Sequence, residues 1–365
     1  MPNKVTVKGK TYKLPIFLPD ATRCLVKTID SQDIKNSGIE GIVVNTYHLL
    51  TYPGISVLDK FGGVKNFMNF DGLVVTDSGG WQIFSLIHRD KKAGSITDRG
   101  VTFSVGGGKK ELFTPEKVIQ TQFKINSDIM ICLDDFTDPV ATEKEVGVSV
   151  GRTILWAKRC KDEYNKIVKA KKLNDKTRPL LFAVIQGASS KKMRERCAKG
   201  LVEIGFDGYG FGGYLVNKET GELDLEMMDY LASLIPEDSV RFALGTGKPK
   251  DIAACAEMGW HIFDCTLPTR DARHKRLYVF NKEPKNLKDL KNPKTHGYMY
   301  VKRRVFSRDQ KPVSKFCDCY TCKNYSRAYL NHLFNLGDPL AHRLATIHNL
   351  RVYSKLTDLL RKFIQ

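Results

Sequence analysis

The sequence lacks any long hydrophobic run. No stretch of its 365 residues approaches the ~18 uninterrupted apolar residues of a membrane-spanning helix, which excludes an integral membrane protein. The opening segment, residues 1–17, also lacks the apolar core and the small-residue cleavage site of a secretory signal. We therefore expect a cytoplasmic protein with no membrane partner.

A disulfide framework is also missing. The cysteines number nine, an odd count, and three of them crowd together as Cys317, Cys319 and Cys322. This usage is typical of reduced thiols together with a metal cluster. The remaining six are scattered singly along the chain: Cys24, Cys132, Cys160, Cys197, Cys255 and Cys265.

Negative charge is scarce. The chain has 59 Lys and Arg but only 40 Asp and Glu, which leaves a net charge of +19. The excess is concentrated in residues 270–315, which hold fifteen basic and four acidic side chains. A block of this kind attracts polyanions and predicts a nucleic-acid partner, although a merely solvated lysine-rich surface is the alternative.

Eight short apolar runs alternate with segments of helical spacing, such as 116–125 and 224–235. Runs of four to eight residues rich in Val, Ile, Leu and Phe are typical of parallel strands buried on both faces. Eight such repeats predict an α/β fold, a (β/α)8 TIM barrel with its active site at the carboxyl ends of the strands. The first run covers 12–19, and the others end at Asn45, Asp77, Asp134, Gln186, Gly212–Gly213, Gly245 and Asp264.

Polar residues at these strand ends form the candidate site. A single Asp at such a position is usually the N-cap of the next helix. Three carboxylates, an Asn and a Gln at successive strand ends favour a shared site at one mouth. Glycine-rich turns at Gly212–Gly213 and Gly245–Gly247 would let a ligand approach the backbone, although they are also compatible with plain tight turns.

Beyond Asp264 the pattern changes to a basic surface excursion over 281–315, followed by amphipathic helices at 327–336 and from 340 onward. We predict a barrel core over 1–280, the excursion and a zinc-binding subdomain over 281–350, and a C-terminal helix over 351–365 packed on the barrel.

Three thiols within six residues predict one structural Zn²⁺ per chain, because a closed tetrahedral site needs only one more ligand. Candidates for the fourth ligand are His332, His342 and His348, and spacing alone does not choose among them.

Eight segments carry a family resemblance. They are DSGGWQIFS (77–85), LDD (133–135), VIQGA (184–188), GFGGYLV (210–216), LGTGKP (244–249), FDCTLPTRDARHKRLYV (263–279), CDCYTC (317–322) and RLATIHNL (343–350). In this order, over nearly the whole chain, they resemble the tRNA-guanine transglycosylase family and its bacterial-type queuine tRNA-ribosyltransferases.

The resemblance implies a zinc-containing barrel that exchanges guanine at the wobble position of tRNA for a 7-deazaguanine. Asp264 would attack the ribose C1′ to give a covalent intermediate, and Asp77 would be the general acid and base, as in a retaining glycosidase. The zinc ligands would be the three clustered cysteines with His348.

The resemblance also implies the binding residues. Asp134, Gln186 and the backbone near Gly213 would read the guanine-like edge, and Trp81 and Leu244 would sandwich the flat base. In the same way, Asn45 and Ser78 would orient the nucleophile or the ribose, and Arg270 and Arg273 would contact the anticodon loop.

Phe136, Tyr214 and Asp271 depart from the family's usual pattern, which leaves the preferred base open. Val216 keeps the bulk typical of enzymes that use 7-aminomethyl-7-deazaguanine, so we predict that base for a homodimeric enzyme of queuosine biosynthesis. The alternatives are direct use of queuine, a non-catalytic tRNA-binding subunit and a DNA-modifying relative.

Overall fold

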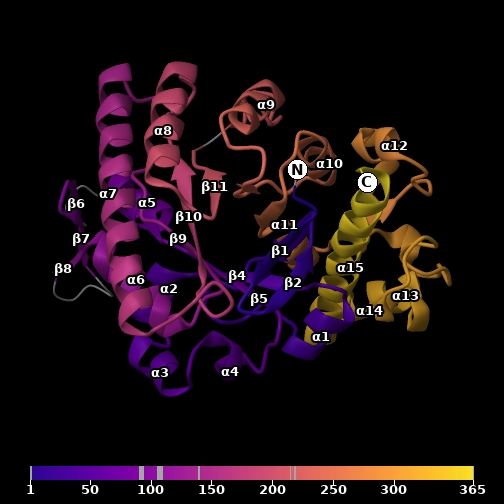
Figure 1. Cartoon of the computed structure of the whole chain (residues 1–365). Helices are drawn as coiled ribbons and strands as arrows, with labels where there is room; N and C mark the ends of the chain where they lie inside the picture. Colours follow the sequence, from indigo (N-terminus) through magenta and orange to yellow (C-terminus); the bar gives the residue numbers. More distant parts are fainter. Residues whose placement is uncertain are drawn as a thin grey trace.

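The centre of the protein is a barrel of eight parallel strands (Figure 1). The computed structural model describes residues 2–89, 94–104, 110–138, 140–213, 215–217 and 219–364. Around the barrel the strand order is β3-β13-β12-β11-β10-β9-β5-β4. The ring is completed between β3 and β4, where Asp20 bridges to Val43 and the Ala21 amide donates to the Val43 carbonyl at 2.8 Å. The predicted (β/α)8 architecture is confirmed.

Each barrel strand overlaps one of the predicted apolar runs, although the first run, 12–19, supplies only residues 16–19 to the barrel. Their side chains pack inside the ring or against the surrounding helices, so both faces of the sheet are buried. The strands are β3 (Ile16–Pro19), β4 (Gly41–Asn45), β5 (Leu73–Asp77), β9 (Ile129–Ile131), β10 (Leu180–Ile185), β11 (Gly208–Phe211), β12 (Val240–Ala243) and β13 (Ile262–Cys265).

An antiparallel hairpin of β1 (Lys4–Val7) and β2 (Lys10–Lys13) precedes the barrel. Its Val5, Val7 and Tyr12 belong to the same apolar cluster as the side chains inside the ring. Because the hairpin leads directly into the start of β3, it covers the amino-terminal end of the barrel. The opposite end, where the strands finish, stays available for a site.

Helices follow the strands along the chain and surround them. Side-chain caps start several of them, such as Thr142 with its capping box at α7 and Ser190 at α8. The two predicted helices are confirmed as α6 and α9. The helices are α1 (Ser31–Asn36), α2 (Thr46–Thr51), α3 (Ile55–Lys60), α4 (Val64–Met68), α5 (Gly80–Arg89), α6 (Pro115–Ile125), α7 (Glu143–Ala170), α8 (Lys191–Ile204), α9 (Leu225–Ser233) and α10 (Pro249–Glu257).

A small antiparallel sheet is inserted between α5 and α6. It consists of β6 (Gly94–Thr97), β7 (Gly100–Ser104) and β8 (Lys110–Phe113). Phe103 and Phe113 bury their rings in the main core, and the Phe103 ring packs edge-on against Tyr47. The insertion is thereby attached to the barrel beside the end of β4.

The segment after β13 builds a third apolar cluster, on the outside of the barrel. Its long helix α15 packs against α11, α10 and β3, and α12, α13 and α14 also contact it (Figure 1). The two predicted C-terminal helices are confirmed as α14 and α15. The elements are α11 (Leu267–Arg273), β14 (Arg276–Phe280), α12 (Leu287–Lys291), β15 (His296–Tyr300), α13 (Tyr320–Asn324), α14 (Arg327–Leu336) and α15 (Pro339–Ile364), with short 3₁₀ turns at Pro293–Thr295 and Arg304–Phe306.

The basic excursion is therefore more regular than a surface loop, because β15 pairs antiparallel with β14, Arg276 opposite Tyr300. Helix α15 runs unbroken through residue 350, and the division into three domains stays a prediction. None of the helices in the described ranges combines the length and the apolar character needed to cross a bilayer.

Candidate active site and metal centre

Asn45 and Asp77 end two neighbouring strands and face each other. The register of β4 and β5 pairs them directly, and the Asn45 amide donates to Oδ2 of Asp77 at 2.6 Å. The other end of the Asn45 amide accepts from the His48 backbone and caps α2. Burial raises the pKa of Asp77, and donors including Gly79 and Asn45 partly counteract that effect.

Asp134 lies three residues beyond β9 and is held by two of the predicted neighbours. Gln186 Nε2 donates to its Oδ2 at 2.6 Å, and the Ser78 hydroxyl donates to its Oδ1 at 3.3 Å. Burial, together with the nearby charge of Asp77, raises the pKa of Asp134 to about 7. Gly80 permits this approach, because a Cβ there would lie 2.9 Å from the Asp134 carbonyl oxygen.

Asp264 is the last residue but one of β13 and is half-buried at the same mouth. Its Oδ1 accepts from the Gly245 backbone amide at 2.8 Å, which fixes the side chain beside the end of β12. Burial raises the pKa of Asp264 to about 7, and the charges of Asp77 and Asp20 act in the same direction. Asp77 is thus electrostatically coupled to both Asp134 and Asp264.

Three carboxyl groups whose pKa values are raised by burial can exchange protons or attack an electrophile. Asp134 with Gln186 offers a different chemistry, a carboxylate and an amide side by side that can read the edge of a planar heterocycle. The strand-end arrangement predicted from the sequence is present.

An aromatic cluster lies beside Asp134. Trp81 is 36% exposed, and its ring centroid is 4.6 Å from that of Phe136 in an edge-on arrangement. Phe136 is buried and also packs against Phe84, with centroids 4.8 Å apart. Leu244 is half-buried and packs so closely on Gly210 that a Cβ there would lie 2.7 Å from it.

Two site residues escaped the sequence analysis. Asp20 directly follows the first apolar run and adds a fourth carboxylate to the mouth, so reading that run one residue further would have found it. Arg194 lies on α8, is fully buried, and donates to the carbonyls of Ile185 and Gly212. Nothing in its sequence context distinguishes it from a solvent-exposed helical arginine.

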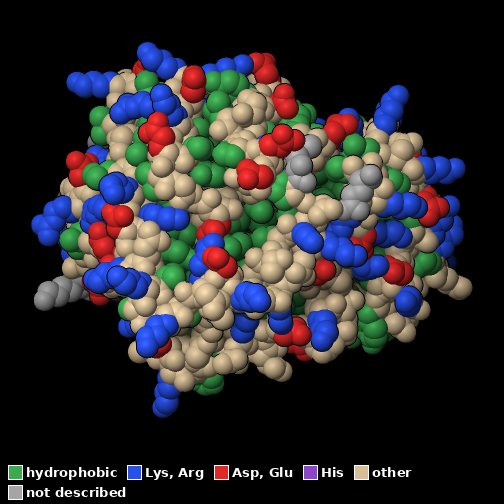
Figure 2. Space-filling model, in the orientation of Figure 1, with side chains coloured by type: hydrophobic (Ala, Val, Ile, Leu, Met, Phe, Trp, Pro, Cys, Tyr) green, Lys and Arg blue, Asp and Glu red, His purple; other side chains and the backbone are tan. Residues whose placement is uncertain are grey.

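The residues predicted to contact RNA lie on α11. Arg270 is exposed, whereas Arg273 is half-buried and donates to the Thr269 carbonyl at 2.9 Å. Asp271 between them is buried and accepts from Arg276 and Tyr278, so it holds α11 on β14. Tyr214 lies outside the described residues. The C-terminal segment lies on the right in Figure 1. Figure 2, in the same orientation, shows many Lys and Arg side chains on that part of the surface.

The three clustered cysteines meet His348 on α15. The ligand atoms of Cys317, Cys319, Cys322 and His348 all lie within 4.8 Å of one another. His348 Nδ1 is 3.3 Å from the Cys322 sulfur, and its other ring nitrogen is 2.7 Å from the Tyr278 carbonyl oxygen. That carbonyl fixes the ring so that Nδ1 faces the thiols, as in many zinc sites. The group can hold a metal ion.

The other two candidate histidines lie elsewhere. His332 is exposed on α14, and the His342 ring packs edge-on against Phe334. The structure therefore selects His348, the residue that the family resemblance implies.

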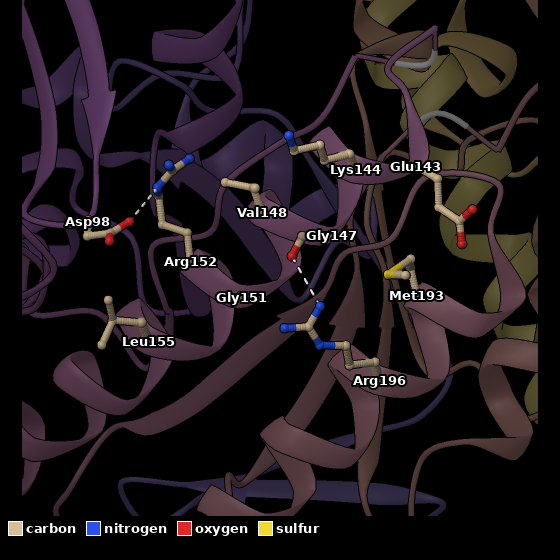
Figure 3. A pocket seen from close by; sticks show the side chains of 10 residues that line it. All are labelled: Asp98, Glu143, Lys144, Gly147, Val148, Gly151, Arg152, Leu155, Met193 and Arg196. Atoms are coloured by element: carbon tan, nitrogen blue, oxygen red, sulfur yellow. Dashed lines mark hydrogen bonds and ion pairs between the residues drawn. The ribbon is translucent and has the colours of Figure 1, made fainter.

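A separate hollow of about 690 Å³ lies between α7 and α8 (Figure 3). Arg152 in its wall pairs with Asp98 and with the buried Asp135, next to Asp134. Arg196 on the other side donates to the Gly147 carbonyl. The lining contains none of the predicted site residues.

Comparison with known proteins identifies the family of this chain. The family model described as queuine tRNA-ribosyltransferase matches residues 3–365. A queuine tRNA-ribosyltransferase of Psychrobacter sp. (strain PRwf-1) is 38% identical over 361 residues, covering 99% of this chain and 88% of the relative. One of Acinetobacter baylyi is 37% identical over 363 residues, covering 99% and 87%. This chain belongs to the queuine tRNA-ribosyltransferase family.

Proposed function

We propose that this chain is a tRNA-guanine transglycosylase of queuosine biosynthesis, which exchanges guanine at the wobble position for 7-aminomethyl-7-deazaguanine through a covalent aspartyl intermediate. The observation that carries the proposal is the convergence of Asp77, Asp134 and Asp264 at one barrel mouth, with Gln186 bonded to Asp134. Family membership supports tRNA as the partner.

Asp264 is the nucleophile in this proposal. Its carboxylate attacks C1′ of the ribose, the bond from C1′ to N9 breaks, and guanine leaves with the electron pair while Asp77 supplies a proton. The incoming base then gives its N9 proton to Asp77, and its N9 attacks C1′ and releases Asp264. Two displacements at one carbon retain the β configuration.

Asp134 and Gln186 read the base in this scheme. Asp134 accepts from the ring N–H and the 2-amino group, and Gln186 with the Gly213 amide donates to the 6-oxo group. Trp81, whose exposed fraction is 36%, stacks on one face of the base, and Leu244 covers the other. Asn45 and Ser78 orient Asp77 and Asp134, the groups that they contact.

The tRNA is held by positive charge. Arg270, Arg273 and the basic segment 270–315 bind phosphates of the anticodon loop, and the target base leaves its stack to reach the pocket. A zinc ion held by the three thiolates and His348 would have no open position, so it would supply stability rather than chemistry. The homodimer and the cytoplasmic location also belong to this proposal.

Direct use of queuine is the second candidate. Phe136 favours the smaller base, 7-aminomethyl-7-deazaguanine, because its ring fills the space beside Trp81 and Phe84. A non-catalytic subunit is disfavoured, since Asp77, Asp134 and Asp264 are all retained and held by hydrogen bonds.

The test uses tRNA that carries labelled guanine at the wobble position. The protein is incubated with this tRNA and with the aminomethyl base, queuine or guanine, and the released label is counted. We expect release with the aminomethyl base and at least about 10³-fold less with Asp264→Asn. Asp264→Asn keeps the acceptor for Gly245, so its melting temperature serves as the control. Equal release by both proteins would refute the nucleophile, and no release by the wild type would refute the function.

A further inference from the structure

Arg194 is a buried cation without a carboxylate partner among the described residues. Its Nε donates to the Ala188 carbonyl at 2.9 Å, and its Nη1 donates to the carbonyls of Ile185 and Gly212 at 2.6 and 2.7 Å. These contacts join the end of β10, which carries Gln186, to the end of β11. Burying a guanidinium in this way is costly, so its presence calls for a reason beyond packing.

Two buried polar atoms, one on Arg194 and one on Gln186, have no hydrogen-bond partner in the part of the chain that the structure describes. One is Arg194 Nη2, a donor, and the other is Gln186 Oε1, an acceptor. Both residues are fully buried. A Cβ placed on Gly213 would lie 3.1 Å from Arg194 Nη2 and 3.8 Å from Gln186 Oε1, so the two atoms border the same small space.

We infer that Arg194 is a positioning residue that fixes the orientation of the Gln186 amide and thereby makes the pocket select 6-oxo over 6-amino bases. A guanidinium can only donate, so it favours Oε1 on its own side of the amide. The NH₂ end is then turned toward Asp134 and the base. This inference rests on the proposed function.

The free protein satisfies that NH₂ group internally, through the 2.6 Å hydrogen bond from Gln186 Nε2 to Asp134 Oδ2. When a guanine-like base occupies the oxygens of Asp134, Nε2 becomes available for a new acceptor. A 6-oxo group accepts this bond, whereas a 6-amino group leaves two donors facing each other. A site built around a defined donor rejects such analogues strongly.

The paired glycines after β11 agree with this arrangement. A Cβ on Gly212 would lie 2.1 Å from Gln186 Nε2, so a side chain there would displace the amide. Gly213 has a φ of +103°, which L residues rarely adopt, and any side chain would press on Nη2 of Arg194. The glycines leave room for the amide and the guanidinium.

The experiment compares two free bases as acceptors in the tRNA exchange assay: 7-deazaguanine, which is 6-oxo, and 2,6-diamino-7-deazapurine, which is 6-amino. Wild type, Arg194→Met and Arg194→Lys are measured. The matched control is Arg196→Met, because Arg196 lies two residues along α8 and lines the outer hollow (Figure 3).

We expect the ratio of kcat/KM for the 6-oxo base over the 6-amino base to fall at least about tenfold in Arg194→Met. The KM for the free base should rise while the KM for tRNA stays within about twofold. Arg196→Met should keep the wild-type ratio. General loosening of the fold would lower both rates together and leave the ratio unchanged.

A wild-type ratio in a folded Arg194→Met protein would overturn the inference. If Arg194→Met does not fold, Arg194→Lys provides the test, because lysine keeps the charge but not the planar guanidinium. A wild-type ratio of the two kcat/KM values in Arg194→Lys would then overturn the inference. Absence of guanine exchange by the wild type would instead refute the proposed function, so the two failures are distinguishable.

Discussion

The Asn45 amide donates to Oδ2 of Asp77 at 2.6 Å, across the paired ends of β4 and β5. A donor to a carboxylate stabilises its ionised form, so this bond lowers a pKa that burial raises. Asn45 thereby opposes the effect of burial on the pKa of Asp77.

Asn45→Asp should move the pH dependence of exchange to higher pH. The variant keeps the oxygen that caps α2, loses the donor and adds a like charge, and both of the latter changes raise the pKa of Asp77. We expect the limb assigned to Asp77 to move to higher pH and kcat/KM to fall by about 10²-fold at neutral pH. A pH-rate profile checks this; an unmoved limb would show that Asp77 does not titrate in it.

Asp134→Asn should stabilise the empty protein at alkaline pH. Asp134 has a pKa of about 7 in the folded protein, above the ~3.9 of an unfolded chain, so the folded state binds the proton more tightly. The cost of ionising Asp134 therefore grows as the pH rises from about 4 to about 7, and it stays constant above that range. An asparagine can still accept from Gln186 and donate to Ser78, so it removes the charge alone.

Thermal melts of the wild type and Asp134→Asn at pH 5 and pH 8 test this expectation. The variant should melt about 1–3 °C higher at pH 8, and the difference should shrink at pH 5. Asp59→Asn on the exposed face of α3 is the control and should show no such trend. If the stability of Asp134→Asn relative to the wild type fell between pH 5 and pH 8, the predicted direction of the pH effect would be wrong.

Metal analysis should find about one zinc per chain, held by Cys317, Cys319, Cys322 and His348. Cys319→Ser should lose most of the metal and melt lower, because the ion ties the cysteine loop to α15. The protein that still folds should keep its exchange chemistry within a few-fold. Cys255→Ser, a buried thiol on α10, should keep its zinc. Full occupancy in a Cys317/Cys319 double variant would refute the site.

The barrel and most of its mouth were predictable because parallel strands buried on both faces must be continuous apolar runs, and their last residues share one edge. Asn45, Asp77 and Asp264 follow from that rule alone. Asp20 was missed although it obeys the same rule, because the run was read as ending at Pro19. The pattern locates a mouth but assigns no chemistry to it.

The other features of the candidate site and metal centre depend on three-dimensional contacts that the spacing of residues in the sequence does not encode. Spacing alone leaves His332, His342 and His348 equivalent, whereas the packing of α15 brings His348 beside the cysteines. Asp271 resembles an RNA-facing residue in sequence, yet it bonds Tyr278 and Arg276 inside the protein. Arg194 has the sequence context of a surface arginine, and only its burial reveals its place beside the base pocket.

Phe136→Val should enlarge the range of accepted bases. Phe136 follows Asp134 by two residues and is 9% exposed, with its ring 4.6 Å from Trp81 and 4.8 Å from Phe84 between centroids. A valine would open space beside the stacking face, where a larger 7-substituent could lie. A change of this size in an apolar contact shifts discrimination by about 1–3 kcal/mol, so we expect kcat/KM for queuine relative to the aminomethyl base to rise about 10- to 100-fold.

Phe84→Val is the matched control for this substitution, because it removes a ring from the same cluster at a position on α5 rather than next to Asp134. It should lower stability in a similar way and leave the ratio of the two bases close to that of the wild type. A wild-type protein that already prefers queuine would overturn the choice of base, because the Phe136 ring would then leave room for the larger substituent and the valine could add little.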